Sequence, residues 1–282
     1  METSVVPPVP PFEAKPAPRK FDWRLFLILG ILGFIASFLV IPYSLALTPA
    51  ETIEAVGGGD GTLMVMSIVG QACTGGILFP LIALGLLAAK ALGMGAPLLE
   101  GLLDRRPVKE LAGKPLLWGF VCGLLGSGAL ILISFVTSPL ITAEYERLGQ
   151  EIPNIQAPAP WMGFLASISA GITEEIMLRL FLLSVLAWLG SRLWRTPEGR
   201  PRRFVFWTAN ILSALAFGLL HFPLATSLGM TAILSLLNTL LMNTLLGLVF
   251  GWLYDRFGLE SAMMGHFSAD LVLHVLLPLL GM

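Results

Sequence analysis

Apolar segments long enough to cross a lipid bilayer dominate this chain. Spanning the roughly 30 Å hydrocarbon core of a membrane takes about 20 consecutive apolar residues in a helix. Seven such runs occur, at about 25–47, 63–89, 116–138, 161–190, 204–222, 229–253 and 259–281. The sequence therefore predicts an all-α, polytopic transmembrane helix bundle of about seven spans, within a range of six to eight.

The composition excludes an ordinary water-soluble domain. Of the 282 residues, 56% are hydrophobic and only 12% are charged, whereas a soluble domain is about 25% charged. The formal net charge is −1, and no nucleic-acid-binding module is recognisable. We expect membrane lipids to surround the protein and no nucleic acid to bind it.

The positions of the basic residues predict the orientation of the bundle. Fifteen of the 17 Lys and Arg residues precede the first span or lie in the second, fourth and sixth loops. Basic residues concentrate on the cytoplasmic side of membrane proteins. We therefore expect a cytoplasmic N-terminus, with the protein in a cell membrane, either a plasma membrane or a bacterial inner membrane.

The same features suggest three parts in the chain. Residues 1–22 are polar and proline-rich, which predicts a disordered cytoplasmic tail. Residues 23–140 would form the N-terminal transmembrane helices. Residues 160–282 would form a second helical unit, and this unit contains the residues that point to chemistry.

Three charged side chains interrupt the fourth apolar run: Glu174, Glu175 and Arg179. A charge near the bilayer centre is unfavourable by several kcal/mol, so these residues should line a protein interior. Glu175 and Arg179 are four residues apart and can pair on one helix face. Glu174 is rotated by about 100° and could face a cavity as a general base. Alternatively, the three residues form a buried ion network that only fastens helices together.

All three histidines of the protein follow within the next hundred residues, at 221, 266 and 274. His266 and Asp270 are four apart and share a helix face. That spacing suits either two ligands of one metal ion or a histidine oriented by a carboxylate. His274 lies on the same face, one turn beyond Asp270.

In this order the motifs resemble those of the CAAX protease and bacteriocin-processing family (CPBP) of intramembrane endopeptidases, also called the Abi family. The resemblance covers about residues 165–275 and rests on Glu-Glu-x-x-x-Arg, then Phe-x-x-x-His at Phe217 and His221, then His-x-x-x-Asp. It implies hydrolysis of a peptide bond at the membrane. The implied catalytic residues are Glu174, His221, His266 and Asp270, supported by Glu175, Arg179 and Phe217. The resemblance assigns no role to His274.

The resemblance leaves the cofactor open, because family members are described both as metalloenzymes and as glutamate-dependent proteases. Asn is frequent at the last motif position, where this chain has Asp270. An ionised aspartate only accepts hydrogen bonds, so it cannot donate one to an oxyanion. It could instead bind Zn²⁺ or another divalent metal together with His221 and His266.

The predicted depth of His221 conflicts with this site. At 1.5 Å per residue, Glu174 and His266 both lie about 20 Å below the outer boundary. A straight helix beginning at Phe204 places His221 only about 5 Å below it on the same geometry. Either residues 204–210 lie in the cytoplasmic interface, or this helix is strongly tilted.

Two other functions fit the same residues. The chain could be a non-catalytic immunity or scaffold protein that binds a peptide through a degenerate protease site. It could also be a small transporter that relays protons through Glu174 and His266, although no internal repeat supports this. For the protease, the expected partner is a peptide or protein substrate, with or without a lipid anchor. The sequence does not identify that substrate.

Overall fold

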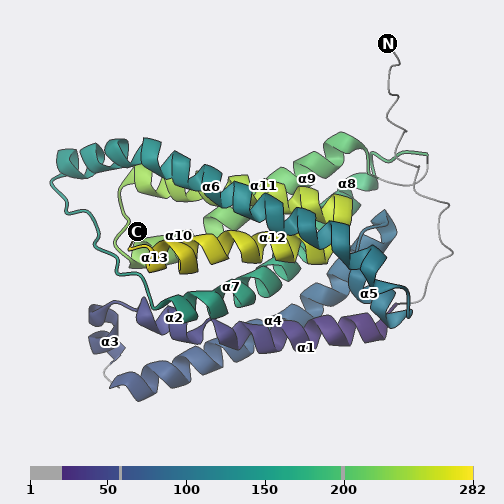
Figure 1. The fold of residues 1–282 in the computed structure, drawn as a ribbon, viewed down its shortest axis with the longest axis horizontal. Helices are drawn as coiled ribbons and strands as arrows, with labels where there is room; N and C mark the ends of the chain where they lie inside the picture. The colour runs from purple at the N-terminus through teal and green to yellow at the C-terminus, as the bar shows by residue number, and fades with distance from the viewer. Residues whose placement is uncertain (1–20, 57–58, 198–200, 282) are drawn as a thin grey trace, which may run out of the picture.

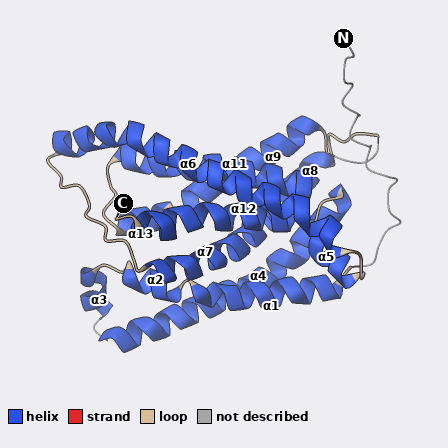
Figure 2. Ribbon diagram, viewed as in Figure 1, coloured by secondary structure: helices blue, strands red, loops and turns tan. Residues whose placement is uncertain are grey.

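Every regular element in the described part of the chain is helical (Figure 2). The computed structural model describes residues 21–56, 59–197 and 201–281. The predicted disordered tail therefore lies almost entirely outside the described residues. The first helix, α1 (Trp23–Leu39), begins directly after Asp22, whose carboxylate accepts hydrogen bonds from the backbone N–H groups of Arg24 and Leu25. This N-cap satisfies two donors that a helix start leaves free.

Six helical segments among the described residues are long and apolar enough to cross a membrane: Trp23–Ala46, Gly61–Leu92, Leu111–Leu148, Arg203–Ser227, Ile233–Phe257 and Leu259–Leu279. The seventh predicted span, 161–190, is also helical and consists of α7 (Pro160–Glu175), the π-helix η1 (Ile176–Leu183) and α8 (Ser184–Ser191). Its three charged residues keep it from qualifying on composition alone. The predicted transmembrane helix bundle is confirmed.

The described chain begins and ends at opposite ends of the bundle. Helix α1 begins at the end that also carries α5 (Pro97–Leu103) and the connection from α8 to α9 (Arg203–Leu220) (Figure 1). The chain finishes at the opposite end, after α12 (Leu259–Leu271), η2 (Val272–Leu276) and α13 (Leu277–Leu279). An odd number of crossings is needed to place the two ends this way.

Two predicted boundaries differ from the structure. Helix α6 (Val108–Leu148) continues well past residue 140, and α11 (Ile233–Phe257) begins four residues later than the predicted 229. These differences are linked, because the Glu144 carboxylate near the end of α6 accepts a 2.8 Å hydrogen bond from the Leu234 N–H at the start of α11. Glu144 is buried. The extension of α6 thus serves as a cap for α11, a contact between distant segments that sequence periodicity does not reveal.

Helix α12 is the central element around which the site is built. It packs against α6, α7 and α11, and α4 (Gly59–Leu92) packs against η1 on the other side of α7. At Gly119 and Gly123 of α6 a Cβ atom would clash with backbone oxygens of α12. Small residues allow such close helix contact in membranes. They let the backbones of α6 and α12 lie against each other.

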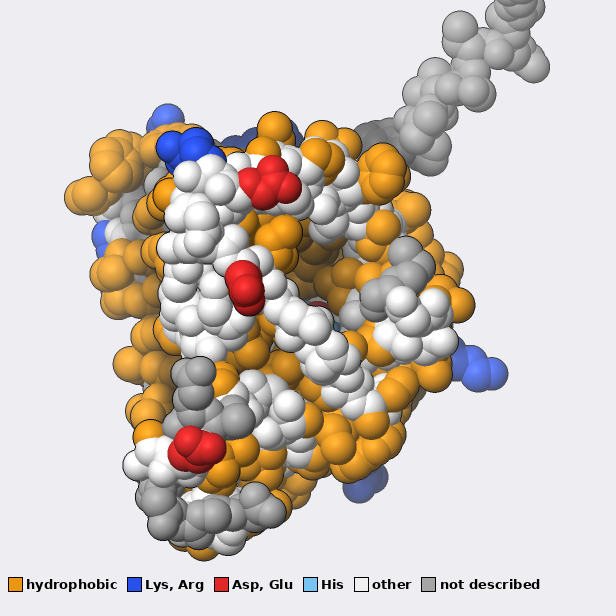
Figure 3. Space-filling view, turned by 90° about the vertical axis from the view of Figure 1, so that its left-hand side faces the viewer, with side chains coloured by type: hydrophobic (Ala, Val, Ile, Leu, Met, Phe, Trp, Pro, Cys, Tyr) orange, Lys and Arg blue, Asp and Glu red, His pale blue; other side chains and the backbone are white. Residues whose placement is uncertain are grey.

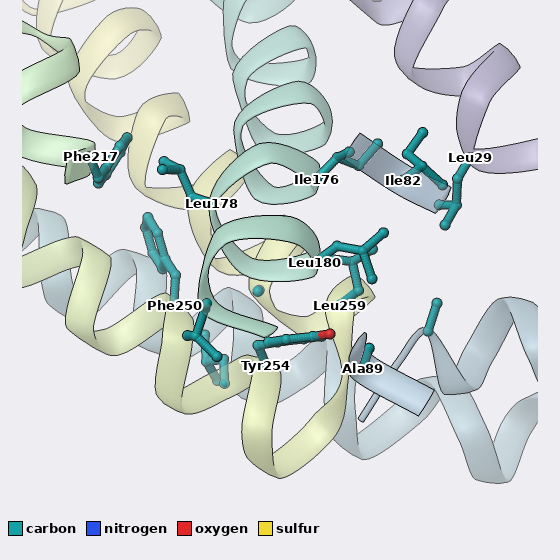
Figure 4. Close-up of a cluster of buried hydrophobic side chains, with 14 of the residues drawn as sticks. Leu29, Ile82, Ala89, Ile176, Leu178, Leu180, Phe217, Phe250, Tyr254 and Leu259 are labelled. Carbon is teal, nitrogen blue, oxygen red and sulfur yellow. The ribbon is translucent and has the colours of Figure 1, made fainter. Parts of the chain in front are cut away.

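The main hydrophobic core surrounds η1 (Figure 4). Leu29 of α1 and Ile82 of α4 pack on one side of it, and Phe217 of α9 and Phe250 of α11 pack on the other. All four side chains are buried. The segment that follows the two glutamates is thereby packed on two opposite sides.

Candidate active site

The local backbone changes at the two glutamates. Helix α7 ends at Glu175, and the wider π-helical turns of η1 begin with the next residue. Segments of π-helix are rare and frequently occur at functional sites. Two serine hydroxyls donate hydrogen bonds to backbone carbonyl oxygens of η1. Ser213 donates to Leu178 O at 2.7 Å, and Ser184 donates to Arg179 O at 3.1 Å. Polar partners therefore stabilise this irregular turn within an apolar core.

Glu175 is the centre of a fully buried polar cluster. Its Oε1 accepts a 2.7 Å hydrogen bond from His266 Nδ1 and lies 3.0 Å from Nη1 of Arg179. Arg179 also donates from Nη2 to the carbonyl oxygen of Gly247 at 3.1 Å. The side chain of Glu175 has no solvent-exposed surface, and that of Arg179 has 1%. The predicted pairing of these two residues is present, and it extends to the histidine of α12.

Aromatic rings enclose this cluster. The Arg179 guanidinium lies 4.9 Å from the ring centre of Phe217 and 5.3 Å from that of Phe250, which is cation–π geometry. Phe250 also stacks on the His266 imidazole, with ring centres 5.0 Å apart and planes 18° apart. Phe217 was expected as a supporting residue from the motif. Phe250 was not, because no motif includes it and only the packing of α11 brings it here.

Glu174 has a different environment from its neighbour. Its side chain is 29% exposed, and its Oε2 lies 4.0 Å from His266 Nε2. It makes no hydrogen bond to another described residue, although His266, His221, Asp270 and Glu175 all lie within electrostatic range. The helix rotation predicted between the two glutamates thus separates a buried, paired carboxylate from a partly exposed, unpaired one.

His221 occupies a break between two helices. It ends α9, and α10 (Phe222–Ser227) follows immediately with Pro223 in its first turn. His221 Nδ1 lies 2.8 Å from the Phe217 carbonyl oxygen, so the ring N–H donates to that carbonyl and Nε2 is left free. The helical path continues six residues beyond His221, about 9 Å at 1.5 Å per residue. The helical span therefore ends at Ser227 and not at the predicted residue 222.

Asp270 faces two imidazoles at once. Its Oδ2 lies 3.6 Å from His266 Nε2, and its Oδ1 lies 4.0 Å from His274 Nε2. The carboxylate that accepts the orienting hydrogen bond from His266 belongs to Glu175, and not to Asp270. His266 Nε2 is consequently flanked by two carboxylates, Glu174 and Asp270.

The described residues contain no group of three or more His, Cys, Asp or Glu side chains arranged to hold a metal ion. His266 donates its Nδ1–H to the buried Glu175 carboxylate, which leaves Nε2 as the nitrogen that could bind a metal. The donors expected to bind Zn²⁺ or another divalent metal, His221, His266 and Asp270, thus do not form a preformed coordination site. A metal ion remains a prediction from the resemblance.

The interior can be reached through hollows in the bundle. Figure 3 shows a hollow lined by hydrophobic side chains, at the end where α13 and the 149–159 loop lie. A separate apolar cavity of about 270 Å³ lies between α7 and α12. Its lining includes Gly171, one turn before the glutamates, and Phe267, next to His266. Apolar surface therefore adjoins the polar cluster.

Together these features define a class: a membrane-embedded helix bundle whose interior carries carboxylates and imidazoles from three separate helices. Residues 156–272 match the family model of the type II CAAX prenyl endopeptidases, described as Rce1-like. The family resemblance drawn from the motifs is confirmed over this region. Searches of curated proteins and of solved structures found no match. The match covers less than half of the chain, and at the level of this family it supports a membrane endopeptidase of the CAAX-protease-like type.

Proposed function

We propose that this protein is an intramembrane endopeptidase that hydrolyses a peptide bond with water activated by Glu174. The observation that carries the proposal is the pair formed by Glu174 Oε2 and His266 Nε2, which lie 4.0 Å apart in the interior of the bundle. This separation is too long for a direct hydrogen bond and suits one water molecule bonded to both atoms.

The buried cluster gives His266 the correct proton arrangement for this role. Because Glu175 accepts the Nδ1–H, a neutral His266 carries its proton there and offers Nε2 as an acceptor. A water between Glu174 and His266 can then donate one hydrogen to each. Its lone pairs remain free to attack a carbonyl carbon, which is the geometry a general base requires.

The reaction then follows in two steps. The water oxygen forms a bond to the carbonyl carbon while Glu174 takes the water proton. As the carbon–nitrogen bond breaks, Glu174 returns that proton to the leaving nitrogen, and a carboxyl group and an amine result. His221 would stabilise the oxyanion that develops between the steps only with a proton on Nε2, in addition to the Nδ1–H that donates to Phe217 O.

The reaction as proposed depends on glutamate and involves no metal step. If Zn²⁺ or another divalent ion binds, His221, His266 and Asp270 are the residues that would hold it, and it would polarise the water or the carbonyl. Chelation separates the two mechanisms.

The substrate in this proposal is a peptide or protein that reaches the site at the membrane. The N-terminus would face the cytoplasm of a plasma or inner membrane, because Lys and Arg concentrate at the end that carries α5 and the α8–α9 connection. The hollow of Figure 3 would then open on the opposite side.

The function can be tested with purified protein in detergent and a panel of internally quenched peptides, with products identified by mass spectrometry. Wild-type protein should cleave at least one peptide, and Glu174→Gln should not. Glu146→Gln serves as the matched control, because Glu146 is exposed near the end of α6. Cleavage retained by Glu174→Gln would exclude Glu174 as the base. Absence of cleavage by correctly folded wild-type protein, with solute uptake in proteoliposomes, would favour the transporter.

A further inference from the structure

A tyrosine from the first part of the chain reaches the polar site. Tyr43 lies in α2 (Ile41–Ala46), and its hydroxyl is 3.0 Å from Nδ1 of His274. The two rings meet edge to face, with centres 5.4 Å apart and planes at 68°. His274 Nε2 lies 4.0 Å from Asp270 Oδ1, and Asp270 Oδ2 lies 3.6 Å from His266 Nε2. An unbroken series of polar groups thus leads from α2 to the imidazole of His266.

The backbone around His274 is shaped for this contact. Residue 274 lies within η2, the second π-helix of the chain, which begins two residues after Asp270. Gly163 of α7 faces this segment, and a Cβ atom there would clash with the His274 carbonyl oxygen. Helix α2 packs on α7 as well. The close approach of α7 therefore brings α2 and η2 near enough for Tyr43 to reach His274.

The distribution of protons follows from the partners. The Tyr43 hydroxyl can donate to Nδ1 of His274, which leaves the histidine proton on Nε2, directed toward Asp270. Asp270 then has one oxygen facing the N–H of His274 and the other facing His266. With one oxygen directed to the His274 N–H, the Asp270 carboxylate keeps its other oxygen 3.6 Å from His266 Nε2, beside the place where the attacking water would lie.

We propose that Tyr43 and His274 are positioning residues that hold the Asp270 carboxylate beside His266 and Glu174. This inference rests on the proposed peptidase function and adds two residues to its site. Both residues lie outside the region 156–272 that matches the family model. The proposal also gives the N-terminal helices a role in the site, because α2 supplies Tyr43.

Steady-state cleavage of one internally quenched peptide tests the proposal, beginning with two single variants and the double variant that combines them. Tyr43→Phe keeps the ring and removes only the hydroxyl. It should lower kcat by about fivefold to tenfold, the effect of one lost hydrogen bond, and leave KM within about twofold. His274→Leu should lower kcat at least as much. Adding Tyr43→Phe to His274→Leu should then cause no further loss, because the hydroxyl acts through the imidazole.

Two amides at position 274 separate positioning from packing. His274→Gln places a donor where Nε2 lies and can still reach Asp270, whereas His274→Asn is too short. The Gln variant should therefore retain more activity than the Asn variant. Tyr145→Phe is the matched control. It removes the hydroxyl of a tyrosine near the end of α6 that donates to the Gly229 carbonyl oxygen, and the kinetics of this variant should equal those of the wild type.

The outcomes distinguish this inference from the proposed function. If Glu174→Gln abolishes cleavage while Tyr43→Phe and His274→Leu both keep wild-type kcat, the positioning role is wrong and the peptidase function stands. Additive losses in the double variant, or equal activity of the Gln and Asn variants, would also overturn it. Cleavage that persists in Glu174→Gln would instead refute the proposed function.

Discussion

Glu174 and Glu175 are adjacent in sequence, yet we expect their replacement by glutamine to have opposite consequences. Glu174→Gln should abolish cleavage and leave stability almost unchanged. Glu175→Gln should destabilise the fold strongly, and it should also lower activity, because the Glu175 carboxylate orients His266. The reason lies in their surroundings, because Glu175 has no exposed surface and two strong partners, whereas the side chain of Glu174 is 29% exposed.

The magnitude for Glu175 follows from its contacts. Its Oε1 lies 3.0 Å from Arg179 Nη1 and 2.7 Å from His266 Nδ1. Two unit charges about 4 Å apart interact by about 4 kcal/mol at an effective dielectric constant of about 20. Removing one partner of a buried ion pair generally destabilises a protein by about 3–5 kcal/mol, because the other charge is left uncompensated. We expect a loss in this range.

For Glu174 the corresponding change in stability is small. It makes no hydrogen bond to another described residue, so an amide of the same shape removes no such bond. The amide loses the attraction of His266 and His221 but also the repulsion by Asp270 and Glu175, and these effects oppose each other. We expect a change below about 1 kcal/mol, since no buried group loses its partner. Its loss as general base should lower the cleavage rate by about 100-fold or more.

Two measurements on the same purified samples test these opposite expectations for Glu174→Gln and Glu175→Gln. Thermal unfolding in detergent, followed by tryptophan fluorescence, should place Glu175→Gln at least about 6 °C below the wild type, taking about 2 °C per kcal/mol for a chain of this size. Glu174→Gln should unfold within about 2 °C of the wild type and show no peptide cleavage. A stable Glu175→Gln variant, or a Glu174→Gln variant as unstable as it, would refute the division of roles between the two carboxylates.

Three further predictions concern the surroundings of the site. Gly123→Leu should destabilise the protein by about 1–3 kcal/mol through overpacking against α12, whereas Gly128→Leu, whose Cβ meets no atom within 4 Å, should not; thermal unfolding of both variants checks this. Arg179→Lys should lower both activity and stability. A lysine ammonium cannot replace the planar guanidinium that lies between the rings of Phe217 and Phe250 and also donates to the Gly247 carbonyl oxygen. Equal unfolding temperatures of the variant and the wild type would contradict this prediction. Treatment with a divalent-metal chelator should leave cleavage unchanged, and a loss that one added ion restores would instead support a metal site.

Much of this protein could be read from its sequence, because the relevant forces act within single segments. A run of apolar residues determines by itself that a segment crosses the membrane, and a carboxylate in such a run requires a protein interior. The spacing of Glu175 and Arg179 was enough to predict their pairing, since both lie on one helix. The rotation between Glu174 and Glu175 followed from helix geometry in the same way.

Contacts between helices were decided only by the tertiary structure. The orienting partner of His266 is Glu175, 91 residues away, rather than Asp270 on its own helix. Phe250 and Tyr43 belong to no motif, and they reach the site because α11 and α2 pack where they do. Such distances depend on how closely backbones approach, which here is set by glycines on opposing faces such as Gly123 and Gly163. A periodic pattern shows which face of a helix is buried, but it does not say which other helix covers that face.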